Sequence, residues 1–322
     1  MNNEDRLRET LATIAKMAHD VAGNGGYSDG GPSNGGPSNG QEPILVCAPK
    51  ALPARLLVQA AQTATRVNPV NAPFLGPLAS VAGDLRIVEP QHIAVLTSKY
   101  WGATARQLTV SFMDTTPADV RARIISHMNA WTKTGCISFV ETGGVGQVRI
   151  SMSNDGYWSY LGTDILHIPK NRQTMNLQGF TMKTPESEYH RVIRHETGHT
   201  LGFPHEHMRR ALVARIDPDK AYEYFLRTQG WDKQTVDEQV LTPLDERSLM
   251  STPADQTSIM CYQLPGSITH DGKPIVGGLD IDQTDYEFAG KIYPNKGQAP
   301  AGGTTGEFED EWDESEDVEV GV

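Results

Sequence analysis

The stretch HETGHTLGFPH, residues 195–205, holds three histidines and one glutamate within eleven residues. His195 and His199 are four residues apart, so on a helix their side chains leave the same face one turn apart. One zinc ion can then bind a nitrogen of each ring, at about 2.0–2.1 Å. Gly202 is expected to end the helix, because glycine enters the left-handed conformation at little cost, and the turn brings His205 back toward the metal. Three histidine ligands leave a tetrahedral position open for water, as in catalytic zinc sites.

Glu196 lies between the two helical histidines and is poorly placed as a third ligand. It is well placed to reach a water molecule at the metal, which is the position of a general base. The alternative interpretation is an ordinary helix surface that happens to carry this pattern. The glycine and the third histidine at these offsets favour the metal site. We therefore expect one Zn²⁺ per chain, bound by His195, His199 and His205.

Composition and charge exclude several classes of protein. The chain has 322 residues and a formal net charge of −12, and its length suits one large domain or two small ones. Nine of its acidic residues and no basic residue lie within 307–319. A nucleic-acid-binding surface needs a basic face, so we expect no nucleic-acid partner. We interpret residues 297–322 as a disordered acidic tail.

The sequence predicts neither a membrane partner nor a standard export signal. No apolar run of about 18 residues is present, as a membrane-spanning helix would need. Residues 1–20 begin with charged residues and lack the apolar core of a signal peptide. Cys47, Cys136 and Cys261 are far apart and do not resemble a disulfide framework. A cytoplasmic protein and one exported without a standard signal both fit these facts.

Three segments are expected before the main domain. Apolar residues at helical spacing predict an amphipathic helix over residues 1–23. Residues 24–42 repeat Gly-Gly-Pro-Ser-Asn, which is typical of a flexible linker. Residues 43–99 are apolar but rich in proline, with a helix expected over 53–67. This third segment is either a removable pro-region or an N-terminal arm.

Residues 100–296 are expected to form one domain of mixed α and β structure. Its predicted strands are short alternating or apolar runs at 108–112, 137–141, 148–152 and 164–169. The last run ends at a proline, which suits an edge strand. The free backbone groups of an edge strand just before the metal helix could hold an extended peptide beside the metal.

Two long helices are predicted in the same domain. Thr116 and Pro117 have the pattern of an N-cap and a first helical residue. The apolar face that follows includes His127, which we interpret as a histidine at the edge of the core and not as a ligand. Pro185 opens the second helix, which carries His195. A strand, a helix, three strands and a metal helix indicate an α+β, or mixed α/β, fold.

The chain resembles the astacins, a family of zinc proteases in the metzincin clan, over about residues 100–294. The residue after the third histidine distinguishes metzincin families, and here it is Glu206, as in astacins. SIMCY at 258–262 is similar to the astacin Met-turn and the tyrosine after it. Further stretches that resemble the family are GCISF at 135–139, YWSYLG at 157–162 and RIDPDKAY at 215–222.

The resemblance implies a fold and an activity. The metzincin fold is a twisted, mostly parallel sheet with an antiparallel edge strand, two long helices and an irregular C-terminal subdomain. The implied activity is that of a zinc-dependent endopeptidase acting on proteins or peptides, with Glu196 as the general base. Two other functions stay open: a catalytically silent binding module, and a zinc hydrolase of a non-peptide substrate. Nothing in the sequence indicates an oligomeric state.

The resemblance also implies roles for single residues. Tyr262 would hydrogen-bond the oxyanion and, in the resting enzyme, could bind the zinc. Met260 would lie beneath the imidazoles, and Gly202 would form the turn. Glu206 would support the site from behind the ligands or pair with a processed N-terminus. Without the resemblance, Met260 would be an ordinary core residue and Glu206 a surface acid.

Cysteines distinguish this chain from the family that it resembles. Astacins hold two disulfides in this domain, but Cys136 has no cysteine near 293–295 to pair with, so we expect unpaired thiols. Members of the family also carry a pro-segment that places an aspartate on the zinc. Asp84 or Cys47 could have that role here. An ordinary turn aspartate and an ordinary buried cysteine are the alternatives.

Overall fold

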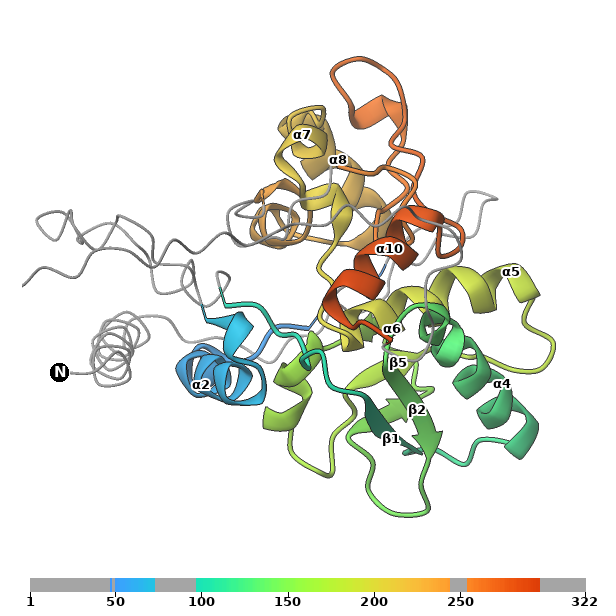
Figure 1. The fold of residues 1–322 in the computed structure, drawn as a ribbon. Helices are drawn as coiled ribbons and strands as arrows, with labels where there is room; N and C mark the ends of the chain where they lie inside the picture. Colours follow the sequence, from blue (N-terminus) through green and yellow to red (C-terminus); the bar gives the residue numbers. More distant parts are fainter. Residues whose placement is uncertain (1–46, 48–49, 73–96, 244–253, 296–322) are drawn as a thin grey trace, which may run out of the picture.

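The computed structural model of the chain describes residues 47, 50–72, 97–243 and 254–295 (Figure 1). The predicted N-terminal helix, the linker, the acidic tail and Asp84 lie outside these residues.

Five short strands form one sheet in the order β2-β1-β3-β5-β4. They are β1 (Arg106–Phe112), β2 (Ile137–Glu141), β3 (Val148–Ser151), β4 (Tyr157–Ser159) and β5 (Met175–Leu177). All neighbouring pairs are parallel except β4 and β5, which are antiparallel. β3 and β5 are buried along their length, as parallel strands covered on both faces are. The predicted mostly parallel sheet with an antiparallel edge strand is confirmed.

The strand predicted at 164–169 is wrong, because Gly162–His167 form a 3₁₀ helix, η6. Gly162 has a φ of +46°, and a Cβ on it would lie 2.0 Å from the carbonyl oxygen of Lys99, so the chain turns here instead of extending. The buried carboxylate of Asp164 then pairs with Lys99 Nζ at 3.1 Å. Asp164 is therefore held by Lys99 and not by a neighbouring strand. The edge of the sheet next to β5 is formed by β4.

The two predicted long helices lie against the sheet (Figure 1). The first is α4 (Ala118–Met128), continued by η5 (Asn129–Lys133). Its predicted cap is wrong: Thr116 Oγ1 donates to the carbonyl oxygen of Asp114 at 3.3 Å, and no side chain caps the helix. The second begins with α5 (Glu186–Glu188), continues through a π turn, η7 (Tyr189–Ile193), and ends with α6 (Arg194–Thr200).

Hydrogen bonds from two buried tryptophans hold both ends of α6. Trp131 Nε1 donates to the carbonyl oxygen of Arg194 at 2.9 Å, and Trp101 Nε1 donates to that of Thr200 at 2.8 Å. The hydroxyl groups of Ser159 in β4 and Thr200 lie 3.1 Å apart. Because both tryptophans are buried in the main hydrophobic cluster, the position of α6 follows from the packing of that cluster.

Residues 50–72, which we call the arm without deciding between a pro-region and a permanent arm, pack on the main body. The arm contains η1 (Ala54–Leu56), α2 (Leu57–Val67) and η2 (Pro69–Asn71), so the helix predicted at 53–67 is present. The buried amide of Asn71 donates to the carbonyl oxygen of Tyr100 at 2.8 Å and accepts from the Tyr100 N–H at 3.0 Å. Near the start of the arm, Lys50 N donates to the carbonyl oxygen of Ser159 in β4 at 3.3 Å.

The chain after α6 is irregular, as predicted. Its helices are η8 (Glu206–Met208), α7 (Arg210–Val213), α8 (Pro218–Gln229), α9 (Lys233–Val236), the π turn η9 (Asp237–Leu241), η10 (Gly266–Ile268) and α10 (Gln283–Ile292). Most of them enclose a second hydrophobic cluster, in which Phe225 and Trp231 stack with ring centroids 5.1 Å apart. α10 returns to the first cluster through Ala289 and Ile292. In Figure 1, α6 and α10 lie between α7 and α8 on one side and the sheet on the other.

The structure bears on two further expectations, which concern disulfides and membrane-spanning helices. No disulfide joins Cys47, Cys136 and Cys261, all of which lie in the described part of the chain. Among the described residues, no helix combines the length and the apolar composition that crossing a membrane requires.

Candidate metal centre

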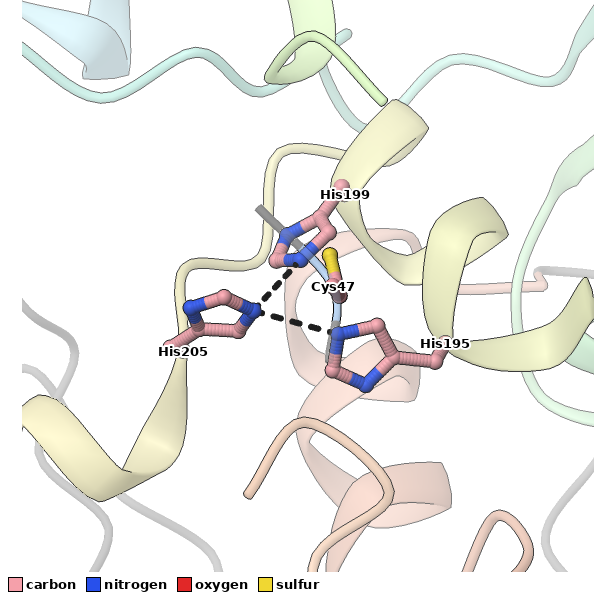
Figure 2. Close-up of side chains that lie close together, drawn as sticks. All are labelled: Cys47, His195, His199 and His205. Carbon is pink, nitrogen blue, oxygen red and sulfur yellow. Dashed lines mark hydrogen bonds between the residues drawn. The ribbon is translucent and has the colours of Figure 1, made fainter. Parts of the chain in front are cut away.

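The three histidines of the HETGHTLGFPH stretch converge (Figure 2). His195 and His199 project from α6, and His205 lies in the extended chain just before η8. His205 Nε2 is 3.1 Å from His195 Nε2 and 2.9 Å from His199 Nε2. All three side chains are buried. Three histidines within eleven residues of sequence therefore direct their Nε2 atoms to a common point.

The turn between them occurs at Gly202, which has a φ of +95°. Its N–H donates to the carbonyl oxygen of His199 at 2.8 Å, directly after the last turn of α6. A Cβ at this position would lie 3.0 Å from the carbonyl oxygen of Lys99. Both the left-handed conformation and the close backbone contact therefore favour glycine.

Backbone carbonyl groups determine the tautomer of two of these rings. His195 Nδ1 is 2.6 Å from the carbonyl oxygen of Ile259, and His199 Nδ1 is 2.8 Å from that of Phe203. A carbonyl oxygen only accepts, so each Nδ1 carries the hydrogen and each Nε2 presents a lone pair. Burial lowers the pKa of His195 to about 4 and also lowers the pKa values of His199 and His205, so the rings are neutral near pH 7.

This donor set fits a zinc ion. Neighbouring ligands at about 2.0–2.1 Å from a tetrahedral zinc lie about 3.3–3.4 Å apart, and the separations of 2.9 and 3.1 Å are only slightly shorter. Buried lone pairs that face one another repel unless a cation lies between them. The Nδ1–H to carbonyl hydrogen bonds are those that usually orient metal-binding histidines.

Cys47 belongs to the same group. Its sulfur and the three histidine nitrogens all lie within 4.8 Å of one another, and Figure 2 shows the sulfur beside the rings. The Cys47 side chain is buried, and the Tyr262 hydroxyl donates to its carbonyl oxygen. Cys47 thus lies at the metal centre, and Lys50 lies at the edge of the sheet, where its N–H pairs with Ser159 of β4. Of the two residues that the sequence offered for this position, the structure describes only Cys47.

Glu196 lies beside the histidines and is almost completely buried, at 1 % exposure. Burial raises its pKa to about 8, while the Cys47 thiol and the Arg191 guanidinium act in the opposite direction. Its Oε2 atom has no hydrogen-bond partner among the described residues. Together with His195, Tyr262, Tyr157 of β4 and Arg191, it lines a pocket. The Glu196 carboxylate therefore lies at this pocket with one buried oxygen that no described residue binds.

Met260 and Glu206 lie behind the ligands. A Cβ added to Gly198 of α6 would be 2.3 Å from Met260 Sδ, so the methionine packs directly on the metal helix. Glu206 is not a surface acid: its Oε1 accepts from the Asp255 N–H at 3.1 Å, and burial raises its pKa to about 7. The Glu206 N–H donates to the carbonyl oxygen of Met260 at 2.9 Å. These contacts join η8 to the segment that carries Met260.

Sequence reasoning missed two residues that support the site. Asp285 of α10 accepts from Ser258 Oγ at 2.6 Å and from the Ile259 N–H at 2.9 Å, and so positions the carbonyl group that orients His195. His207 is fully buried and stacks on Tyr262 with ring centroids 4.1 Å apart. The second histidine in His205-Glu206-His207 was a signal for His207, whereas Asp285 lies too far along the chain to be recognised by spacing.

Comparisons with known proteins agree with this geometry. The family model of astacin, peptidase family M12A, matches residues 95–275. Zinc metalloproteinase nas-27 of Caenorhabditis elegans is 27% identical over 142 residues, which are 42% of this chain and 31% of the relative. The match thus spans about a third of the length of that curated relative. A solved structure of myroilysin has a TM-score of 0.58 and 28% identity, and the match covers 62% of this chain and 97% of that one.

The cofactor of the centre is Zn²⁺, as the sequence predicted. The family match, the zinc metalloproteinase relative and the three-histidine group of the structure agree on this ion.

Proposed function

We propose that this chain, which belongs to the astacin family, peptidase family M12A, is a zinc-dependent endopeptidase with His195, His199 and His205 as the zinc ligands. One observation carries the proposal. Three neutral, buried Nε2 atoms meet beside the carboxylate of Glu196, which lines a pocket and has one buried oxygen without a hydrogen-bond partner among the described residues. This arrangement combines a metal site with a group that can exchange a proton.

Glu196 is the general base. When bound, Zn²⁺ supplies Lewis acidity, which makes a water molecule more acidic and polarises a carbonyl group. Glu196 takes the proton of that water and passes it to the leaving amine. Its raised pKa of about 8 suits this double task better than that of an exposed glutamate.

Tyr262 is the proposed donor to the oxyanion. The centroid of its ring lies 4.2 Å from that of the tilted His205 ring, and the His207 ring stacks on it. Its hydroxyl donates to the carbonyl oxygen of Cys47, which is the kind of acceptor that a substrate carbonyl would replace. Burial raises the pKa of this phenol well above its usual value, so the hydroxyl keeps its proton for donation.

The substrate is a protein or peptide that extends along β4. This strand pairs with β5 on one side, and on the other side the Ser159 carbonyl oxygen accepts a hydrogen bond from the Lys50 N–H at 3.3 Å. The edge therefore accepts a backbone strand, which is how extended peptides bind to a sheet. This argues for a peptide over a small ester or amide. The presence of Glu196 and Tyr262 together argues against a catalytically silent binding module.

In this arrangement Cys47 and Lys50 keep the enzyme inactive. The Cys47 thiol lies where it can occupy the ligand position that three histidines leave open. Its carbonyl group holds Tyr262, and Lys50 covers the edge of β4. Cys47 and Lys50 must therefore leave these positions before a substrate enters, so we assign the blocking role to Cys47.

The test exchanges Glu196 for glutamine in the full chain, with and without Cys47→Ala. We expect Glu196→Gln to retain about one tightly bound zinc per chain. In the Cys47→Ala background it should lose at least about 10²-fold in casein cleavage relative to Cys47→Ala alone, because general acid–base catalysis contributes that much. Glu223→Gln, an exposed glutamate on α8, is the matched control and should cleave normally. In the Cys47→Ala background, cleavage by Glu196→Gln at the unaltered rate would exclude this mechanism.

A further inference from the structure

A second histidine–carboxylate cluster lies outside the metal centre. His127 is in the last turn of α4, and Glu186 and His190 are one turn apart at the start of the helical stretch that leads to α6. One donor atom of each lies within 4.8 Å of the others. Glu186 Oε1 is 3.2 Å from His127 Nε2 and 3.3 Å from His190 Nε2. Three elements of the main body thus bring together two imidazoles and a carboxylate.

The hydrogen bonds of His190 direct the lone pair of its Nε2 atom toward Glu186 and Arg194. Its Nδ1 is 2.9 Å from Asp280 Oδ2, so Nδ1 carries a hydrogen and donates it to that carboxylate. In the neutral ring, Nε2 then presents a lone pair to Glu186 Oε1 at 3.3 Å. The Arg194 guanidinium, with Nη2 3.3 Å from Nε2, partly offsets the repulsion between this lone pair and the carboxylate, and a metal ion bound to both atoms would remove it. A carboxylate that holds the far nitrogen of a histidine is also the usual support of a metal-binding imidazole.

His127 completes the set as a neutral ring. Its side chain is 7 % exposed, and burial lowers its pKa. Its Nδ1 has no hydrogen-bond partner among the described residues, so no hydrogen bond at that atom determines the tautomer, and Nε2 can present its lone pair. Because an Nδ1–H without an acceptor is unfavourable when buried, ion binding here should be weaker than at the three-histidine centre.

Two arginines limit the affinity further. Arg123 pairs with the other oxygen of Glu186. Arg194 pairs with Asp280 and places Nη2 3.3 Å from His190 Nε2, where it competes with an ion. Glu186 is exposed, with 59% of its side chain accessible, so an ion can enter from solvent and keep water ligands.

We propose that His127, Glu186 and His190 bind a second divalent ion of the Zn²⁺, Co²⁺ or Ni²⁺ class, with Asp280 orienting His190. Two imidazoles and a carboxylate suit these ions better than Ca²⁺ or Mg²⁺, which prefer oxygen ligands. The ion joins α4 to the helical stretch that carries His195. It adds a weaker site to the one Zn²⁺ per chain that the sequence predicted, and the site is independent of the proposed peptidase activity.

The test is a zinc titration of the metal-free full chain by calorimetry. We expect two sites of different affinity in the unaltered chain. The double variant Glu186→Gln/His190→Asn should lose the weaker site and keep the tighter one, which also shows that it is folded. The matched control is Glu287→Gln/His270→Asn, a pair of exposed residues outside the cluster, and it should keep both sites.

A second measurement uses the melting temperature. Zinc beyond the first equivalent should raise the melting temperature of the unaltered chain and of the control, because an ion that binds only the folded state stabilises it. It should leave that of Glu186→Gln/His190→Asn unchanged. A single site in the unaltered chain, or two sites in the cluster variant, would overturn the proposal.

Discussion

Two backbone carbonyl oxygens determine how the metal-site histidines present themselves. They belong to Ile259, far along the chain, and to Phe203, in the turn after α6. Each holds the Nδ1 hydrogen of a ring and so directs Nε2 inward. The ligand set is therefore a property of side chains, but its orientation is a property of the surrounding backbone.

Exchange of Cys47 should test directly whether its thiol blocks the metal centre. In the full chain, Cys47→Ala should raise the rate of casein cleavage several-fold, because alanine has no sulfur to occupy the open ligand position. Labelled casein, with zinc supplied equally to all samples, measures the rate. Cys136→Ala, a cysteine outside the metal group, should cleave at the unaltered rate. Equal rates for both variants would show that Cys47 does not block the centre.

At the scale of elements, the helical stretch from Glu186 to Thr200 carries most of the chemistry. It changes from α5 through the π turn η7 to α6, and π turns occur often at functional sites. Its first part supplies Glu186 and His190 to the second cluster, and its last part supplies His195 and His199 to the metal centre. One continuous helical stretch thus connects the two clusters.

Gly162 should be the more sensitive of two glycines with positive φ. Gly162→Ala places a Cβ 2.0 Å from the Lys99 carbonyl oxygen, whereas a Cβ on Gly179, with a φ of +69°, meets nothing within 4 Å. Both variants strain the backbone, but only Gly162→Ala adds overpacking, which costs about 1–3 kcal/mol. We expect its melting temperature to fall below that of Gly179→Ala by about 2–4 °C per kcal/mol. Equal melting temperatures would contradict the role of Gly162 in η6.

At the scale of the whole molecule, α10 joins the two hydrophobic clusters. Ala289 and Ile292 pack in the first cluster, and the Asp285 carboxylate holds Ser258 and the Ile259 N–H, which precede residues of the second. Burial raises the pKa of Asp285 from 3.8 to about 6. When Asp285 loses its proton, its negative charge is buried in the folded state, and this lowers the stability of the fold.

The stability should consequently depend on pH through Asp285. Between about pH 3.8 and 6 the folded state binds this proton more tightly than the unfolded state, so the contribution of Asp285 falls as pH rises through that window. Relative to Asp285→Asn, the unaltered chain should lose up to about 1.4 kcal/mol per pH unit there. Urea unfolding of both proteins at pH 5 and pH 6 measures the difference. A difference in stability that does not change with pH would contradict the assignment.

Several features could be predicted from the sequence because they depend on local spacing. The interval between His195 and His199, the glycine turn and the alternating runs of β1, β2 and β3 need only the geometry of a helix, a turn and a strand. The arm helix α2 and the helix after Pro185 were predicted for the same reason. The strand predicted at 164–169 failed because Lys99, distant in the chain, offered Asp164 a partner that outweighs a weak local pattern.

The sequence by itself predicted that His195, His199 and His205 come together, because three histidines within eleven residues can reach one ion through a helix and a turn. Only the tertiary structure decided that Cys47 lies with them, that Asp285 holds the segment behind His195, and that His127 meets Glu186 and His190. These contacts join residues that are distant in the chain. They form only when burial of the two hydrophobic clusters folds separate elements together, and local spacing carries no information about that packing.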